Sequence, residues 1–214
     1  MSQPPTPAIQ ATSTSPNLSD LEHDNWRQLV LATKQEKEQT ERSGFKTMTV
    51  ATNTASGADA RMVVLRQVDE VRRYIWFHTD VRAEKVMQLE AFPTVMLVFW
   101  DENSQVQLRL TAETRLHTDD HTADEHWQKL WVGSRKTYLS EQTPGSEQPT
   151  PYPGFPVALG EDLPTEADSE AGRKNFAVIE CRVLAMDYLH LGRGGQRRAL
   201  FQYEPDRKVT WLAP

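Results

Sequence analysis

Apolar and polar residues alternate along much of the chain after residue 45, in short segments separated by turn-forming residues. Such alternation is typical of strands with one buried face. The clearest case is 106–116, where Val106, Leu108 and Leu110 alternate with polar residues. The pattern predicts strands over 47–52, 61–65, 73–78, 94–100, 106–116, 176–187, 198–203 and 209–212.

Helical spacing of apolar residues marks other segments. The first contains Trp26 and Leu29, which repeat at an interval of three as on one face of a helix. Good N-cap residues and helix breakers set the expected limits. The pattern predicts one helix from a Ser19 or Asp20 N-cap into 34–41, one over 81–91, and one from an Asp119 or Asp120 N-cap to about 131.

These elements predict a mainly β fold, an antiparallel barrel with peripheral helices. Residues 1–17 consist mostly of Ser, Thr, Pro, Gln and Ala, which cannot build a core, so we expect a disordered tail there. Residues 18–214 are then one domain. Within it, 142–172 is a long loop rich in proline, and loops of this length are uncommon unless functional or disordered.

Composition narrows the class of protein. The 214 residues fit one domain with a sizeable core, and no apolar run is long enough to span a bilayer. A net charge of −6 gives no support to nucleic-acid binding. The N-terminus has no secretory signal pattern, and the one cysteine, Cys181, excludes an intrachain disulfide. We therefore expect a cytoplasmic protein, with Cys181 buried in its apolar strand.

Basic residues in two neighbouring elements carry the candidate chemistry. Arg61 lies in a predicted strand, where Arg61, Val63 and Leu65 share a face. Arg82 and Lys85 are three apart near the start of the predicted helix, so they share a face of its first turn. The free backbone N–H groups of a first turn also attract anions. This arrangement predicts a site that binds the phosphate group of a small cofactor.

A metal site is not expected. His117, His121 and His126 are close in sequence to Asp120 and Asp124. Acidic residues at the start of a surface helix are normal capping residues, so this cluster has an ordinary structural explanation.

Several motifs together resemble those of a known family. They are Arg61-Met62-Val63-Val64-Leu65-Arg66, then Thr79-Asp80-Val81-Arg82-Ala83-Glu84-Lys85, then Gln105-Val106-Gln107, then Gly194-Gly195-Gln196-Arg197-Arg198 and a closing Leu212-Ala213-Pro214. Their order resembles that of the pyridoxamine 5′-phosphate oxidase family of FMN-binding split barrels. The subgroup it is most similar to is the oxidase-like one typified by cyanobacterial proteins of unassigned function. The resemblance covers about 24–140 and 175–214.

The resemblance implies a homodimer with FMN bound at the interface. It implies that Arg61 lies against the flavin phosphate and ribityl chain and that Lys85 binds the phosphate. Arg82 replaces an arginine that usually precedes that lysine, and Gln107, or Gln105 in another register, reaches the flavin. The full set of implied cofactor-binding residues is Arg61, Met62, Val63, Val64, Arg66, His78, Thr79, Arg82, Lys85, Gln107, Tyr188 and Arg198.

Other positions depart from the family pattern. Gly194 and Gln196 stand where a true oxidase has an Arg-x-His pair that orients pyridoxal phosphate. Of the Tyr, Arg and Ser that bind the substrate phosphate, only Ser134 has a counterpart, while Arg66 replaces a lysine and keeps its charge. The resemblance therefore implies an intact FMN site without an intact vitamin B6 phosphate site.

The functional expectation is an FMN-dependent oxidoreductase with an unknown small-molecule substrate and unknown catalytic residues. Three alternatives stay open. The chain is a true pyridoxamine or pyridoxine 5′-phosphate oxidase, a flavin-binding module without turnover, or a barrel that binds haem or another anionic ligand.

Overall fold

The computed structural model describes residues 17–34 and 43–214, so the predicted tail over 1–16 lies outside the described residues. One antiparallel sheet organises the chain, with strand order β3-β2-β1-β4-β5-β6-β7-β8 and a further pairing of β3 with β6. The strands are β1 (Thr47–Thr54), β2 (Gly57–Asp69), β3 (Tyr74–Asp80), β4 (Thr94–Asp101), β5 (Val106–His117), β6 (Phe176–Gly192), β7 (Gly195–Gln202) and β8 (Lys208–Leu212). The predicted mainly β, antiparallel fold is confirmed.

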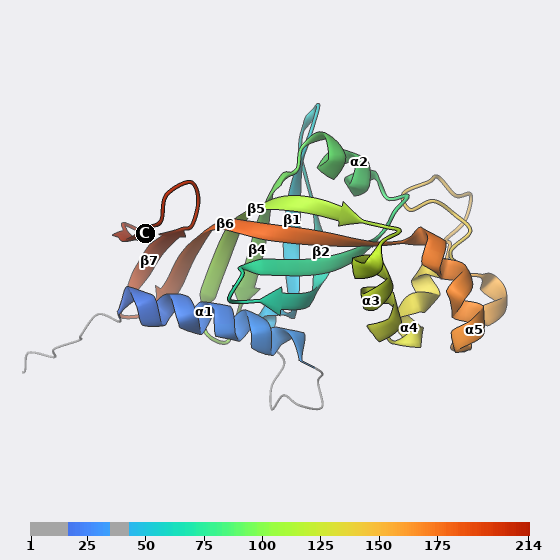
Figure 1. The fold of residues 1–214 in the computed structure, drawn as a ribbon, viewed down its shortest axis with the longest axis horizontal. Helices are drawn as coiled ribbons and strands as arrows, with labels where there is room; N and C mark the ends of the chain where they lie inside the picture. Colours follow the sequence, from blue (N-terminus) through green and yellow to red (C-terminus); the bar gives the residue numbers. More distant parts are fainter. Residues whose placement is uncertain (1–16, 35–42) are drawn as a thin grey trace, which may run out of the picture.

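The long strand β6 closes the barrel. One of its edges pairs with β5 over almost its whole length. Its other edge pairs first with β3, from Phe176 to Arg182, and then with β7, from Ala185 to Gly192. Strands β1 to β6 therefore form a closed barrel, while β7 and β8 extend the sheet beyond it. In Figure 1, β6 runs along the centre of the molecule between these two parts.

The core has two parts because β6 is covered on both faces at its start. Ile179 and Cys181 lie in the barrel core together with Leu97, Leu110 and other apolar residues of the inner face. Phe176 and Val178 face a second cluster with helix residues such as Trp127 and Tyr138. Cys181 is fully buried, as expected from its apolar strand.

The helices surround the barrel at three places. They are α1 (Leu18–Thr33), α2 (Glu84–Ala91), α3 (His121–Lys129), α4 (Val132–Arg135) and α5 (Glu166–Ser169), with 3₁₀ turns η2 (Gly44–Lys46), η3 (Lys136–Leu139), η4 (Val157–Leu159) and η5 (Glu170–Asn175). Figure 1 shows α1 along one end of the molecule and α3, α4 and α5 grouped at the other. No helix among the described residues is long and apolar enough to cross a lipid bilayer.

Two predicted helix starts are wrong, each because of a local side-chain hydrogen bond that the sequence pattern does not reveal. Asn17, assigned to the tail, is the N-cap of α1 and its side chain accepts a hydrogen bond from the Ser19 N–H at 2.9 Å. Asp80 accepts one from the Arg82 N–H at 2.8 Å, which shapes a turn before α2. Helix α2 therefore begins at Glu84, and Arg82 precedes its first turn.

The predicted loop over 142–172 contains short helices, and the sequence pattern missed α4 and η3 before it. These elements have four residues or fewer, too short to show a helical period. Tertiary contacts set them instead: buried Arg135 donates to the Leu130 carbonyl at 3.1 Å and to Glu170 at 2.8 Å. The segment after β5 is thus a helical layer packed on the start of β6.

Candidate functional site

A cavity of about 860 Å³ lies where β2 and β3 separate. The two strands pair from Asp69↔Tyr74 as far as Leu65↔Phe77, with an irregularity at Arg66, and no pairing continues beyond it. Residues of β2 before Leu65 pair with β1, and their second edge has no strand partner in the part of the chain that the structure describes. The cavity opens along this edge, and it is lined by Arg61, Met62, Val63, Val64, Arg66, His78, Thr79, Asp80 and Lys85 on the barrel side.

The bulge at Arg66 separates the strands. Leu65 pairs with Phe77 and Gln67 pairs with Trp76, so Arg66 is an extra residue in β2. A bulge bends its strand and changes the direction of nearby side chains, and bulges are common beside functional sites. The Arg66 side chain lines the cavity, and burial lowers the pKa of its guanidinium.

Arg61 is fixed by three polar neighbours at one end of the cavity. Its Nη1 donates to Thr52 Oγ1 at 2.6 Å, and its Nη2 donates to Gln88 Oε1 at 3.0 Å and to the Asp59 carboxylate. The Gln88 amide also donates to Asp59 at 3.2 Å, which completes the network. A guanidinium has five N–H donors, so this geometry holds Arg61 in place and leaves donors for a ligand.

Lys85 lies beside Arg61 with a neutral partner. Its Nζ donates to Thr79 Oγ1 at 3.1 Å, and no salt bridge to it occurs among the described residues. Burial, and after it the Arg61 guanidinium, lowers the pKa of the Lys85 ammonium. A half-buried cation without a carboxylate partner is costly, and an anionic ligand would offset that cost.

His78, which lines the cavity, forms a partly buried pair with His126. The His78 Nε2 and His126 Nδ1 atoms are 2.9 Å apart, and the rings meet edge to face. Burial, Arg66 and His126 together lower the pKa of His78 to about 2, and burial also lowers the pKa of His126. Both rings are therefore neutral at ordinary pH. Among the described residues, His78 Nδ1 and Arg66 Nε are buried without a hydrogen-bond partner.

Arg82 lies outside the cavity. Its guanidinium binds Asp80 through Nε at 2.9 Å and Nη2 at 2.6 Å, and Nη2 also donates to the Ser140 carbonyl at 3.0 Å. Asp80, by contrast, does line the cavity. The sequence pattern grouped Arg82 with Lys85, and the turn that precedes α2 separates them.

The three remaining predicted residues come from β5, β6 and β7 and do not reach this cavity. Gln107 pairs with Trp100 and with Leu189, and Leu189 pairs with Arg198, so these residues share one face of the sheet. Arg198 there binds Asp187 at 2.7 Å. Tyr188 lies on the opposite face, buried in the barrel core.

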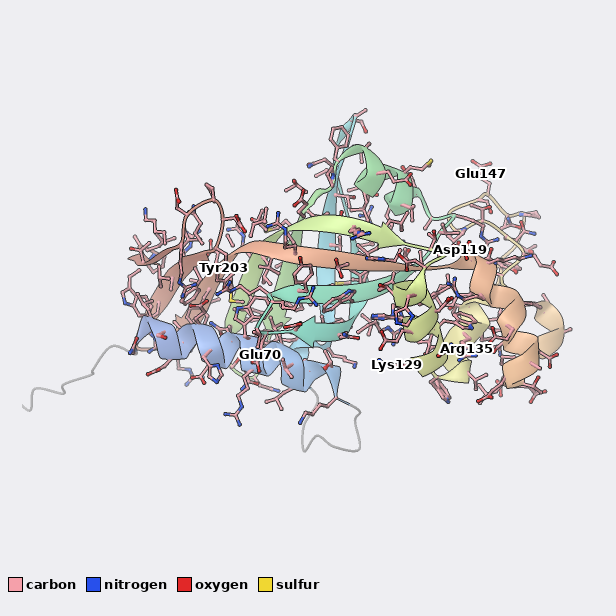
Figure 2. All side chains as sticks on the ribbon, in the orientation of Figure 1. Glu70, Asp119, Lys129, Arg135, Glu147 and Tyr203 are labelled. Carbon is pink, nitrogen blue, oxygen red and sulfur yellow. The ribbon has the colours of Figure 1, made fainter. Side chains whose placement is uncertain are left out.

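The second wall of the cavity was missed by reasoning from sequence. It consists of Thr137, Tyr138, Ser140, Gln142, Thr143, Pro144, Gly145, Ser146, Gln148, Pro149, Thr150, Pro151, Tyr152 and Gly154. Figure 2 shows Glu147 on this segment, on the same side of the molecule as α2. The length and proline content of the loop were the available signal, since such loops are usually functional or disordered.

Comparisons with known proteins agree with this architecture. Residues 23–118 match the family model described as the FMN-binding domain of pyridoxamine 5′-phosphate oxidase. This segment, which runs from α1 to the end of β5, is thus similar to the FMN-binding domain of that family. The expectation of FMN as the cofactor is confirmed at the level of the family. The segment contains the barrel wall of the cavity, whereas Tyr188 and Arg198 lie outside it.

Solved structures with the same fold cover nearly the whole chain. A pyridoxamine 5′-phosphate oxidase-related, FMN-binding protein from Nostoc punctiforme is 21% identical, with a TM-score of 0.62, over 94% of this chain and 99% of that one. PhzG from Burkholderia lata, solved in complex with tetrahydrophenazine-1-carboxylic acid, is 15% identical, with a TM-score of 0.65, over 94% and 95%. The predicted split barrel is thus confirmed as the fold.

The buried histidine pair predicts how stability depends on pH. Because the pKa of His78 is lowered in the folded state, the unfolded chain takes up its proton first as the pH falls below about 6.5. The free energy of unfolding should then decrease from pH 6.5 downward, toward pH 2. Between pH 6.5 and 5 the contribution of His78 is up to about 2 kcal/mol.

Urea unfolding of the flavin-free protein at several pH values measures this effect. His78→Gln should flatten the pH dependence below 6.5, while the matched variant His23→Gln, at an exposed position of α1, should leave it as in the unmodified protein. Equal slopes for His78→Gln and the unmodified protein would contradict the assignment.

Proposed function

We propose that the protein is an FMN-dependent oxidoreductase of the pyridoxamine 5′-phosphate oxidase-like type that acts as a homodimer on a small-molecule substrate. The observation that carries the proposal is the Lys85 ammonium, half-buried in the cavity beside Arg61 with only a hydroxyl partner among the described residues. A phosphate monoester supplies the negatively charged partner that Lys85 lacks.

The free edge of β2 suits the rest of the cofactor. A strand edge presents backbone N–H and C=O groups at regular intervals. A flavin ring has donors and acceptors along its polar rim, so residues 61–64 offer it hydrogen-bond partners without a special side chain. The cavity volume of about 860 Å³ falls within the usual range for cofactor sites. The residues present therefore fit FMN.

Each group of residues then has a distinct task. Arg61, Lys85 and Thr79 hold the phosphate, and the edge of β2 orients the ring system. The bound flavin supplies the redox chemistry. Arg66 and His78, with unpaired nitrogen atoms in the same wall, are available to a second, acidic ligand beside the flavin. His78 stays neutral there and acts as a hydrogen-bond partner, since its lowered pKa keeps the second proton off.

The first expected outcome concerns the phosphate. The protein should bind one FMN per subunit and prefer FMN to riboflavin. Lys85→Ala and Arg61→Ala should each weaken FMN roughly tenfold to a hundredfold, because a charge-assisted hydrogen bond contributes about 1.5–3 kcal/mol. Fluorescence titration with both flavins measures the preference.

A matched lysine variant outside the cavity serves as the control for this titration. Lys129→Ala removes an exposed lysine of α3 that pairs with Glu125, so its flavin affinities should equal those of the unmodified protein. Equal affinity of the unmodified protein for FMN and riboflavin would contradict a phosphate site at Lys85.

The homodimer is proposed from the outer face of the sheet. Met62 pairs with Thr49, and Thr49 with Val98, in a row next to Trp100 and Gln107. On this face Met62 is 63% exposed and Trp100 is 41% exposed, although both are large apolar residues. Burying them against a second copy gains roughly 25 cal/mol per Å² of apolar surface. It would also bring Gln107 and Arg198 of each copy toward the cofactor cavity of the other.

Light scattering of the purified protein tests this arrangement. We expect a dimer at micromolar concentration, and Trp100→Glu should shift it toward monomer and weaken FMN binding together. Val71→Glu, at an exposed apolar residue in the β2–β3 turn, should change neither property. A monomer that retains FMN at full affinity would overturn the proposal.

The proposed substrate is not pyridoxamine 5′-phosphate. Gly194 and Gln196 replace the cation and imidazole of a true oxidase; Gly194 lies in the turn between β6 and β7, and Gln196 lies near the start of β7. His126, in the segment that would hold the substrate-phosphate residues, is bonded to His78. Two missing charged contacts at about 2 kcal/mol each would lower kcat/KM close to a thousandfold.

Steady-state oxidation of pyridoxamine 5′-phosphate under air by the FMN-loaded protein measures this directly. We expect a kcat/KM well below about 10⁴ M⁻¹s⁻¹. A higher value would favour the alternative of a true oxidase. If several reductants, including NADH and NADPH, leave the flavin oxidised, the alternative of a flavin-binding module without turnover gains support.

A cytoplasmic location is part of the proposal, in keeping with the reduced, buried Cys181.

A further inference from the structure

The segment 141–154, here called the cavity loop, is closed on itself by Tyr152. The Tyr152 hydroxyl accepts from the Glu141 N–H at 3.3 Å and from the Ser140 hydroxyl at 3.5 Å, so the two ends of the loop meet. Inside the loop, Gln148 donates to Gln142 at 3.2 Å and to Ser146 at 3.0 Å. A loop with close ends and internal packing is an Ω-loop, and such loops are frequently functional.

The cavity loop supplies a neutral wall opposite a charged one. Eleven of its residues line the cavity, all of them uncharged: Gln142, Thr143, Pro144, Gly145, Ser146, Gln148, Pro149, Thr150, Pro151, Tyr152 and Gly154. The barrel wall opposite contributes Arg61, Arg66 and Lys85. A phosphorylated ligand is thus gripped by the barrel and enclosed by the loop.

Arg82 ties the base of this loop to the barrel. Its guanidinium binds both carboxylate oxygens of Asp80, the last residue of β3, and also donates to the Ser140 carbonyl at 3.0 Å. The pairing with Asp80 raises the pKa of Arg82, so the charge is permanent. Fork-shaped arginine pairs combine strength with fixed geometry, which a single contact would not provide. One residue therefore sets the position of Ser140, where the loop begins.

A second cation anchors the segment beyond the loop. Lys136 is 8% exposed, and its ammonium donates to the Gly160 carbonyl at 2.6 Å and to the Asp162 carbonyl at 2.8 Å. Its Nζ also lies 4.0 Å from the centre of the Phe155 ring. The cavity loop is thus held at both sides, at 140 and at 155–162, while the hydrogen bonds found for Ser146 and Gln148 in its middle stay within the loop.

We propose that the cavity loop is a gate over the cofactor cavity and that Arg82 is the positioning residue that keeps it closed. The proposal rests on the proposed FMN site for its ligand, but the gate is a property of the chain alone. Arg82 acts on the rate at which a ligand enters and leaves, through Ser140. It does not recognise the phosphate, because Asp80 and Ser140 hold its guanidinium outside the cavity lining.

Amide hydrogen exchange of the flavin-free protein tests the gate without any ligand. Arg82→Ala should raise the exchange rates of the amides in 141–154 at least tenfold and leave those of β1 and β4 unchanged. Tyr152→Phe, which removes the closing hydroxyl without touching the barrel, should raise the rates in the same segment. Arg207→Lys is the matched control, since it disturbs a bidentate pair with Glu22 on α1. Unchanged amide exchange rates in 141–154 for both Arg82→Ala and Tyr152→Phe would overturn the proposal.

Flavin exchange separates the gate from phosphate recognition. Arg82→Lys keeps the charge beside Asp80, so it should speed both association and dissociation of FMN about tenfold and change the FMN-to-riboflavin affinity ratio less than twofold. Lys85→Ala should lower that ratio at least tenfold. A fall of the ratio in Arg82→Lys similar to that in Lys85→Ala would make Arg82 a phosphate ligand and overturn the gate. If no variant binds FMN, the proposed function fails, while the hydrogen-exchange result still decides on the gate.

Discussion

The separation of β2 from β3 is the constraint on which the site depends. A closed barrel pairs both edges of every strand, and such a wall has no place for a ligand along its backbone. Here the bulge at Arg66 ends the β2–β3 ladder at Leu65↔Phe77, and β3 continues its pairing with β6 alone. The edge of β2 over 61–64 is left free, but the barrel stays closed. Strand β6 is long enough to pair with β3 and, further along the same edge, with β7.

The cavity has a positive charge because the nearby carboxylates are already paired with arginines. Asp59 is bound by Arg61, and Asp80 by Arg82 from outside, so both acidic groups near the phosphate position are compensated. Lys85 and Arg66 have no carboxylate partner among the described residues, and each is at least half-buried with a lowered pKa. The barrel wall thus has a positive excess in a partly dry setting, where charge interactions are stronger than in water. An anionic ligand is the simplest group that balances it.

Local sequence motifs were enough to predict the barrel wall of the cavity. Arg61, Thr79 and Lys85 come together because two adjacent strands and the following turn are close in sequence, and their residues were expected in one site. Arg82 was grouped with Lys85 by spacing, but a turn closed by the Asp80 carboxylate precedes the helix and keeps Arg82 out of its first turn. Tyr188 was matched by its distance from Arg198, yet the hairpin pairs Arg198 with Leu189, which puts Tyr188 on the other face. The wall formed by 141–154 depends on contacts to Tyr152 and Arg82 that have no periodic signature.

The absorption spectrum of the protein as purified, followed by mass analysis of any ligand released on denaturation, tests the central claim most directly. The account predicts a flavin spectrum with close to one flavin per subunit, identified after release as FMN. Release of riboflavin alone, or a haem spectrum in place of a flavin spectrum, would contradict a cavity built around the phosphate of FMN. A colourless protein that takes up no FMN on reconstitution would contradict it equally.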